Sequence, residues 1–504
     1  MSRATTLAGG MGSVARGGAF AFLGSVVSAV MGLVLVVVLG RVLGTDGAGI
    51  VFQAIAAFTI ALSLAKFGLD TTAVWLLPRL RAEAPGQLRS AAAGLLVPAF
   101  GVGLLGTGGL LLLSRFVDDQ ERLAQSLSAM SWALPLAAVA LVALAATRAL
   151  GGVRTFVTVQ NIFIPTARPL LAWVVTLAGG SAVAVAVSWV SPFPVAALVA
   201  LAILASQLRR HAQARPADGG ANEVQAGLTR RIWTYTLPRA VSAVLEESMR
   251  WLDVLLVGLL AGPTAAGLYG AATRFTNAGM IVSTSLRIVV APMYSRHLGD
   301  GDVRSANDLY TVTTIWIIAF SVPLYVLLTL FSGSMIGLLG QDFRDGALAL
   351  SILAVGMAMV LTAGNIQSVL LMSGHSSLAA LNKLLAVTVN VVLVLLLVPP
   401  LGIVGAALAW VAAMAVDTVL ALLQVRIWVG LRPLQGGVLA ALLTVVLTCG
   451  IPASILRGSL GDTVTAALIS AALGAVCLLA ALWRWRRVFH LAGLAGIMTG
   501  RKKN

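Results

Sequence analysis

Hydrophobic residues along the chain occur in long runs separated by short polar segments. Each run is close to the roughly 20 apolar residues that a helix needs to cross a bilayer. The pattern therefore predicts an all-α integral membrane protein with about fourteen spans, of which the seventh is the least apolar. The predicted spans are 19–39, 50–69, 91–113, 127–147, 156–178, 182–205, 233–260, 265–291, 312–332, 347–372, 379–398, 402–423, 436–454 and 463–483.

The basic residues between these runs are strongly asymmetric. With the N-terminus placed in the cytoplasm, 22 lysines and arginines fall in inside segments and five in outside segments. Basic residues collect in the cytoplasmic loops of inner-membrane proteins. We therefore expect a multi-pass protein of a bacterial inner membrane, with both termini in the cytoplasm.

The longest polar stretch, 206–231, separates six predicted spans from the remaining eight and reads as a cytoplasmic linker. The segments on its two sides are similar: GRVLGTDGAGIVFQAIAAF and GLLAGPTAAGLYGAATRF align Gly44 with Gly262 at an offset of 218 residues. Parallel six-helix repeats are a known transporter plan, with the substrate path between the repeats. The expected organisation is a six-helix lobe at 1–205, the linker at 206–231, a second six-helix lobe at 232–430, and two further helices with a basic tail at 431–504.

Composition supports lipid as the solvent of this chain. It is 59% hydrophobic and only 10% charged over 504 residues, whereas a soluble domain carries about 25% charged residues. The net charge of +16 is explained by the cytoplasmic loops, so we expect no nucleic-acid partner. Nucleotide-binding, zinc and nucleophile-elbow motifs are missing, and we expect no catalytic residue, no cofactor and no metal site.

Ionisable residues inside spans are costly and usually face a cavity or a partner. The candidates for anion binding are Arg274, Arg250, Arg168, Lys66 and Arg287, and those for ion coupling are Glu246, Asp253 and Asp70. Lys66, Arg287, Lys383 and Asp417 lie nearer the cytoplasmic ends of their spans, where snorkelling explains them equally well.

Spacing along the helices refines these candidates. Glu246, Arg250 and Asp253 follow each other at i, i+4 and i+7, so they share one face of the seventh span. This face is either a self-neutralising stripe or the polar wall of a cavity with a carboxylate that takes a proton. Arg168 and Arg274 have no acidic residue within one turn on their own helices. Arginines that converge on a cavity suit a diphosphate, because the guanidinium fork matches phosphate oxygens.

Several motifs resemble the polysaccharide-transporter, or oligosaccharide flippase, family, which is related to lipid II flippases and to multidrug extrusion transporters. In the first lobe they are the segment aligned above and KFGLDTTAVWLLPRL. In the second lobe they are LPRAVSAVLEESMRWLDVLLVGLLAGPTAAGLYGAATRF, VVAPMYSRHL, LGQDFRDGALALSILAVG, LLMSGHSS and VPPLGIVGAALAWVAA. The ordered set covers nearly the whole chain.

The resemblance implies a two-lobed, V-shaped fold with a cationic central cavity. It also implies alternating access and an undecaprenyl-diphosphate-linked oligosaccharide as substrate. Lipid II flippases have a cavity-facing arginine in a box like ADRL, and ATRF here matches it with Arg274. A sodium site of some relatives is only partly matched, since Asn390 is present but Val394 and Trp410 replace an Asp and a Thr.

The expected partners are the lipid-linked oligosaccharide, membrane lipids, a coupling ion such as a proton, and glycan polymerase or ligase machinery. One alternative function is a multidrug or cation antiporter, although such exporters typically have twelve spans. A second is a membrane-embedded glycan polymerase or ligase, which would be expected to carry a large outside loop. The longest predicted outside loop has about 15 residues.

Overall fold

The computed structural model describes residues 2–117, 120–213, 221–277, 279–433 and 436–484. Every regular element in these ranges is a helix, and ten of the helices are long and apolar enough to cross a membrane. The predicted all-α membrane architecture is confirmed, while the count of fourteen spans stays a prediction. The basic tail from residue 485 and the linker residues 214–220 lie outside the described residues.

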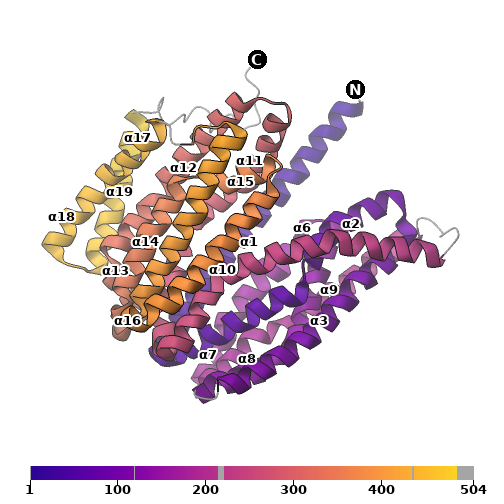
Figure 1. Cartoon of the computed structure of the whole chain (residues 1–504), viewed down its shortest axis with the longest axis horizontal. Helices are drawn as coiled ribbons and strands as arrows, with labels where there is room; N and C mark the ends of the chain where they lie inside the picture. The colour runs from indigo at the N-terminus through magenta and orange to yellow at the C-terminus, as the bar shows by residue number, and fades with distance from the viewer. Residues whose placement is uncertain (1, 118–119, 214–220, 278, 434–435, 485–504) are drawn as a thin grey trace. The chain divides into compact units, whose positions relative to one another are not determined.

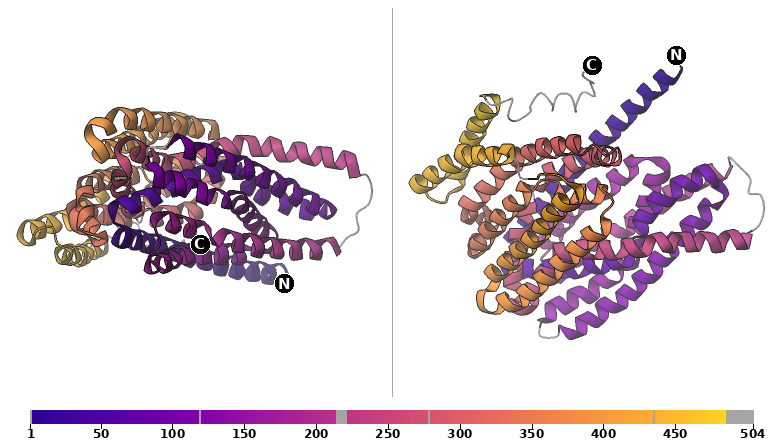
Figure 2. Two further views of the ribbon diagram at one scale, coloured as in Figure 1. Left: turned by 90° about the horizontal axis from the view of Figure 1, so that it is seen from below. Right: turned by 45° about the horizontal axis from the view of Figure 1, so that its top comes forward.

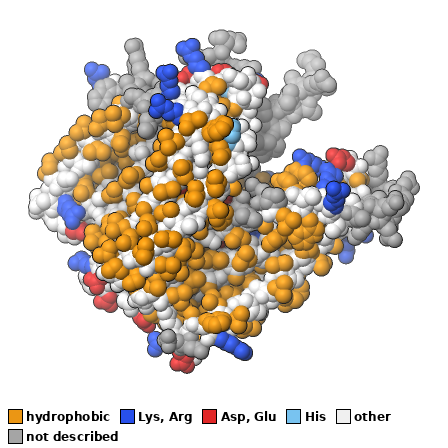
Figure 3. Space-filling view, viewed as in Figure 1, with side chains coloured by type: hydrophobic (Ala, Val, Ile, Leu, Met, Phe, Trp, Pro, Cys, Tyr) orange, Lys and Arg blue, Asp and Glu red, His pale blue; other side chains and the backbone are white. Residues whose placement is uncertain are grey.

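The outer surface is apolar to an extent that only lipid can cover. Leu105, Phe116 and Trp483 are each about three-quarters exposed, and hydrophobic side chains dominate the visible face (Figure 3). Hydrocarbon offers no partner for a backbone N–H or C=O group, so the chain satisfies these groups within helices. Lipid as the surrounding solvent thus explains both the apolar composition and the all-helical fold.

Internal contacts divide the chain into a first unit, Met1–Leu259, and a second unit, Leu260–Asn504. The first unit holds α1 (Ser2–Lys66), α2 (Leu69–Glu83), η1 (Pro85–Gln87), α3 (Leu88–Phe116), α4 (Glu121–Ser131), α5 (Ala133–Gly151), α6 (Val153–Phe156), the π-helix η3 (Val157–Phe163), α7 (Ile164–Leu177), α8 (Ala182–Val190), α9 (Pro192–Gln213) and most of α10 (Ala221–Asn277).

The second unit begins within α10. It holds α11 (Met280–Gly299), α12 (Val303–Leu330), α13 (Ser332–Ile336), η4 (Gly337–Leu339), η5 (Gln341–Gly346), α14 (Ala347–Thr362), α15 (Ile366–Met372), α16 (Ser376–Gln424), the π-helix η6 (Val425–Val429), α17 (Gly436–Val445), the π-helix η7 (Val446–Gly450), α18 (Ile451–Leu460) and α19 (Val464–Arg484).

Three long helices are each divided by a glycine in a left-handed backbone conformation. Gly44 in α1 has φ 67°, Gly262 in α10 has φ 87°, and Gly402 in α16 has φ 57°. L-residues with a Cβ rarely adopt such angles, so glycine is required where one span turns into the next. Gly44 and Gly262 are the pair that the internal repeat aligns, and they share nearly the same ψ as well, −170° and 171°.

Small residues build the core of the first unit. The alanine-rich α5 is buried along most of its length, including Ala137 and Ala140. Gly103 of α3 lies against Pro135 of α5, where an added Cβ would come within 2.6 Å of the proline Cα. Small side chains let membrane helices approach closely, and close packing is what stabilises helix pairs in lipid.

The part of α10 before Leu259 packs within the first unit. Thr72 and Thr236 share a buried hydrogen bond of 2.8 Å between their hydroxyls, and Gln120 donates from Nε2 to the Gly258 carbonyl at 2.8 Å. The contact-based units meet at Leu259, whereas the expected second lobe begins at residue 232. The expected domain boundaries stay predictions, because hydropathy does not reveal which neighbour a helix packs against.

The second unit is built around α12, which contacts α11, α14 and α17. Trp316 and Val322 of α12 lie in one buried cluster with Val445, Cys449 and residues of α19. The C-terminal helices α17, α18 and α19 form one edge of this unit in all three views (Figures 1 and 2). The helices predicted to follow the second lobe are therefore packed onto it by apolar contacts.

Candidate functional site

The polar face predicted on the seventh span is split by burial. Asp253 is 2% exposed, and its Oδ1 accepts a 2.8 Å hydrogen bond from the Val254 N–H. Arg250 is exposed and lies 3.3 Å from Glu247, which is three residues earlier and only 20% exposed. Glu246 is exposed. Of the three residues on this face, Asp253 is therefore buried inside the first unit, whereas Arg250 lies on the surface.

Lys66 and Asp70, four residues apart, form an ion pair. Lys66 Nζ lies 3.2 Å from Asp70 Oδ2, and the two side chains are 23% and 27% exposed. The pair bridges a break in the helix at Phe67 and Gly68, which have φ angles of 48° and 75°. Asp70 Oδ1 also accepts from the Thr71 N–H at 2.8 Å. Asp70 therefore pairs with Lys66 and also accepts a hydrogen bond from the first turn of α2.

Arg168 lies in an aromatic cage within the first unit. Its guanidinium carbon is 3.5 Å from the centroid of the Trp189 ring and 5.2 Å from that of Phe193. Its Nε donates to the Trp189 carbonyl at 3.2 Å. Phe58 packs edge-on against the same indole, at 5.9 Å between ring centroids. A cation over an aromatic face is stabilised by the ring quadrupole, so the cage compensates the charge of the half-buried Arg168.

Sequence reasoning missed this cage. Trp189 and Phe193 are four residues apart on either side of the α8–α9 turn, and an aromatic pair at that spacing beside a deep arginine was the available signal. Trp173, which lies in the same predicted span as Arg168, is half exposed.

Polar residues of the second unit join the two halves of α16 on either side of Gly402. Lys383 Nζ lies 2.9 Å from Asp417 Oδ2, and the Asp417 side chain is 7% exposed. Asn382 and Gln424 exchange two amide hydrogen bonds of 2.7 and 2.8 Å. The amide pair was not foreseen, because its members are 42 residues apart and meet only through the register of the two helix halves.

The remaining predicted anion ligands also belong to the second unit. Arg274 is half-buried near the end of α10, and Arg287 is exposed on α11. The predicted site residues are therefore divided between the units, with the seventh-span face, Lys66, Asp70 and Arg168 in the first. Among the described residues, no group of three His, Cys, Asp or Glu side chains is placed to hold a metal ion.

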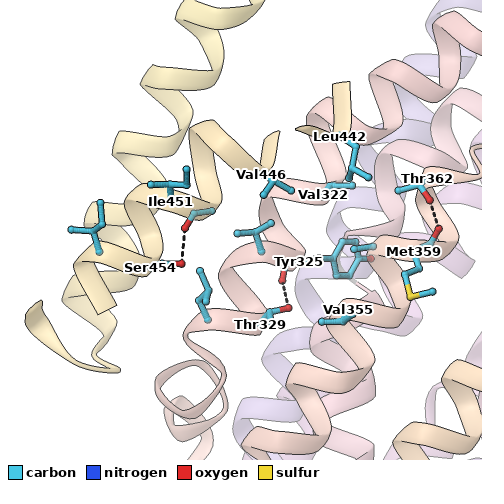
Figure 4. Close-up of a pocket in the computed structure, with 15 residues that line it drawn as sticks. Val322, Tyr325, Thr329, Val355, Met359, Thr362, Leu442, Val446, Ile451 and Ser454 are labelled. Carbon is cyan, nitrogen blue, oxygen red and sulfur yellow. Dashed lines mark hydrogen bonds between the residues drawn. The ribbon is translucent and has the colours of Figure 1, made fainter. Parts of the chain in front are cut away.

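An apolar groove of about 580 Å³ runs along the second unit between α12, α14 and the segment from α17 to α18 (Figure 4). Val322, Val355, Val446 and Ile451 are among its walls. The hydroxyls that line it are used by the backbone of their own helices. Thr329, Thr362 and Ser454 donate to the carbonyls of Tyr325, Met359 and Gly450 at 2.6 to 2.8 Å.

The hydroxyl of Tyr325 is also satisfied by the backbone, because it donates to the Thr276 carbonyl at 2.7 Å. With its polar atoms satisfied, the groove presents hydrocarbon to whatever enters it. A surface of this kind suits an acyl or polyprenyl chain and offers little to a sugar or a phosphate. Neither the groove nor its residues were predicted, since an apolar wall has the same composition as any lipid-facing helix.

Comparison with known proteins places this fold. A family model described as polysaccharide biosynthesis protein matches residues 14–298, and one described as MatE matches residues 238–421. The chain is 26% identical over 199 residues to the probable low-salt glycan biosynthesis flippase Agl15 of Haloferax volcanii. That match covers 38% of this chain and 41% of the relative, so it spans about two-fifths of the relative's length.

Solved structures show the same fold at low identity. The lipid II flippase MurJ in an inward closed conformation matches with a TM-score of 0.69 at 12% identity, over 92% of this chain and 98% of that one. An inward-facing multidrug resistance MATE transporter of the MOP superfamily matches with a TM-score of 0.60 at 13% identity, over 80% and 95%. A MOP superfamily transporter from Pyrococcus furiosus gives 0.57 at 15% identity, over 83% and 95%. Because the first family model covers more than half of the chain, this multi-pass membrane protein belongs to the polysaccharide biosynthesis protein family.

Proposed function

We propose that the chain flips an undecaprenyl-diphosphate-linked oligosaccharide across a bacterial inner membrane by alternating access. The observation that carries this proposal is the polysaccharide biosynthesis match over residues 14–298. The named flippases that resemble the chain in sequence and in fold support it. A lipid-linked oligosaccharide has three chemically different parts, and each needs a different surface.

The apolar groove of the second unit is our candidate for the lipid chain. Its volume of about 580 Å³ and its satisfied hydroxyls suit hydrocarbon. One of its walls comes from η7 and α18, which lie beyond the MatE match that ends at residue 421. A drug antiporter with only the matched helices would lack that wall, so the groove favours a lipid-bearing substrate.

For the diphosphate we propose Arg274 first, followed by Arg250, Arg287, Lys66 and Arg168. Arg274 lies about ten residues into its predicted span, and its ATRF box resembles the ADRL box that carries the cavity-facing arginine of lipid II flippases. Arg250 and Arg287 have exposed guanidinium groups. Lys66 and Arg168 rank last, because both are less exposed than Arg250 and are held by Asp70 and by the aromatic cage.

The sequence shows no nucleotide-binding motif, so we propose that an ion gradient or the membrane potential powers transport. We propose a proton carried by Glu246 or Asp253, with Asp70 as a further candidate. Asp253 is 2% exposed, and a carboxylate buried to this degree has to keep a partner or be neutralised by a proton. Protonation of Asp253 would remove a charge from the interior of the first unit.

Reconstitution tests the proposal directly. The full chain is placed in vesicles that carry an undecaprenyl-diphosphate-linked oligosaccharide with a fluorescent label, and an impermeant quencher reports the label exposed outside. We expect the protected half of the label to become accessible much faster than in protein-free vesicles. Equal rates with and without protein would overturn the proposal.

The second candidate function is a cation antiporter, and the MATE-like fold at a TM-score of 0.60 favours it. The same vesicles test it with rhodamine 6G and an imposed proton gradient. Gradient-driven rhodamine transport without oligosaccharide flipping would establish the antiporter in place of the flippase. A membrane-embedded polymerase or ligase would instead lengthen or transfer the labelled glycan, which chromatography of the recovered lipid would reveal.

A further inference from the structure

An aromatic stack at one end of the first unit holds two arginines side by side. The rings of Trp75 on α2 and Tyr235 on α10 are parallel to within 7°, with centroids 4.2 Å apart. Arg79 lies four residues after Trp75, and Arg231 lies four residues before Tyr235. Because the two arginines are one turn from the stack on their own helices, both guanidinium groups come to the same indole.

The distances confirm this convergence. The guanidinium carbon of Arg79 is 4.4 Å from the centroid of the Trp75 ring, and that of Arg231 is 5.6 Å from it. The two carbons therefore lie within about 10 Å of each other. Cation–π contact fixes each charge in position and leaves its N–H groups free to donate in the plane of the guanidinium.

The helices that carry the stack are themselves fixed. Thr236 is next to Tyr235 on α10, and Thr72 is three residues before Trp75 on α2. Their hydroxyls share the buried 2.8 Å hydrogen bond described above. Thr236 also donates to the Ile232 carbonyl at 2.8 Å. The pair of arginines is thus presented by a rigid junction, so little side-chain entropy is lost when it binds a ligand.

Local carboxylates compensate this charge only weakly. Glu83 lies 3.8 Å from Arg231, but the two side chains are 61% and 41% exposed, and exposed pairs of this kind contribute little. Arg81, on the same helix as Arg79, is committed differently, since its Nη1 donates to the Leu150 carbonyl at 3.0 Å. Arg79 is exposed. The junction therefore has a surplus of ordered, accessible positive charge.

Its expected position in the membrane indicates the ligand. The arginine asymmetry predicts this end of the spans to be cytoplasmic, and Trp and Tyr are enriched where membrane meets water. Lys and Arg side chains gather over α2 on the visible face (Figure 3). The cytoplasmic leaflet is rich in anionic headgroups, and guanidinium forks match phosphate oxygens.

We propose that Arg79 and Arg231, ordered by the Trp75–Tyr235 stack, form a binding site for the phosphate of an anionic phospholipid headgroup. This site is separate from the proposed transport activity. A variant that loses the phospholipid and still flips oligosaccharide at the wild-type rate supports the site and leaves the transport proposal intact.

The test is lipid binding by the purified full chain in phosphatidylcholine nanodiscs, titrated with phosphatidylglycerol and measured by native mass spectrometry. Each of Arg79→Gln and Arg231→Gln is expected to weaken phosphatidylglycerol binding about fivefold, and the double variant is expected to weaken it more than either single change. Arg304→Gln, which removes an exposed arginine from a predicted cytoplasmic segment of the second unit, is the matched control and should leave binding unchanged.

Two further variants guard against a simple loss of folding. Arg79→Lys keeps the charge and loses the fork, so binding should fall about threefold while thermal stability is retained. Trp75→Leu keeps both arginines and removes the surface that orders them, so it should also weaken binding. The site would be overturned if Arg79→Lys and the double Gln variant both bound phosphatidylglycerol as tightly as the wild type.

Competition identifies the source of the phosphate. Phosphatidylglycerol should not be displaced by glycerol phosphate in solution, nor by undecaprenyl diphosphate at a tenfold lower concentration than its own. Displacement by glycerol phosphate would show a site for free phosphate, and preferential displacement by undecaprenyl diphosphate a site for the transported lipid. Either result would overturn the assignment to bulk phospholipid.

Discussion

Arg168 and Trp189 are joined twice, through a cation–π contact of 3.5 Å and through a 3.2 Å hydrogen bond from the arginine Nε to the tryptophan carbonyl. The two residues lie on successive helices of the first unit, α7 and α8. Their contact explains how a deep arginine is tolerated without an acidic residue on its own helix. It also changes what a mutation of Arg168 is expected to do.

The first prediction is that Arg168→Gln acts on stability. Loss of a desolvated cation–π contact costs about 2 kcal/mol, and Trp189→Leu should cost a similar amount. The double variant should be less destabilised than the sum of the two single variants, because both remove the same contact. Thermal unfolding in detergent measures all three. Strict additivity would show that the contact contributes nothing.

The second prediction concerns Lys383 and Asp417. Asp417→Asn should destabilise the second unit by about 3 kcal/mol, because it leaves a partly buried ammonium without its counter-ion. The pair of changes Lys383→Met and Asp417→Leu should restore much of the stability, since apolar side chains can replace a buried ion pair. Unfolding of purified variants tests this. A double variant less stable than Asp417→Asn would contradict it.

Much of the fold was predictable, since span length and the apolar runs are set by the thickness of the bilayer. The turns at Gly44 and Gly262 were predictable from the repeat, and the Lys66–Asp70 pair from its spacing within four residues. Each of these depends on residues that are near in sequence or related by an offset.

Contacts that depend on the register of two helices were not predictable. The amide pair Asn382–Gln424, the cage around Arg168 and the Trp75–Tyr235 stack each require that two helix faces meet at one height. Hydropathy indicates that a helix lies in lipid, but it does not indicate which neighbouring helix it packs against. For the same reason the span order could not show that the first part of α10 makes its contacts within the first unit.

The third prediction is that the seventh span couples transport to protons. Asp253→Asn and Glu246→Gln should each slow flipping in vesicles without lowering the amount of folded protein, because an amide cannot exchange a proton at this position. Glu121→Gln, which alters an exposed carboxylate in a predicted outside segment, is the control. Wild-type rates in both seventh-span variants would remove this helix as the coupling element.

The fourth prediction is topological. Both termini and the linker at 206–231 should be cytoplasmic. In a chain with Cys449→Ala and Cys477→Ala, a cysteine introduced by Asp218→Cys should resist an impermeant maleimide in intact cells. One introduced by Ser459→Cys, in a predicted outside segment, should react. Labelling of Asp218→Cys from outside would reverse the orientation that the 22-to-5 asymmetry predicts.

The fifth prediction is that Arg274 contacts the diphosphate. If instead the arginine only balances the carboxylates Glu246 or Asp253, then Arg274→Ala should lower stability, and adding Glu246→Gln or Asp253→Asn should restore folding and transport together. We expect no such rescue. Restored flipping in either double variant would exclude direct contact with the substrate.

The most direct test of the whole account is the initial rate of oligosaccharide flipping in vesicles, compared between wild type, Arg274→Lys and Arg274→Ala. Lysine keeps the charge and loses the bidentate fork, which for one charge-assisted hydrogen bond corresponds to a loss of about tenfold. We predict rapid flipping by wild type, about a tenth of that rate for Arg274→Lys and none above background for Arg274→Ala, with equal amounts of folded protein. A wild-type chain no faster than empty vesicles, or an Arg274→Ala variant as fast as wild type, would contradict the account.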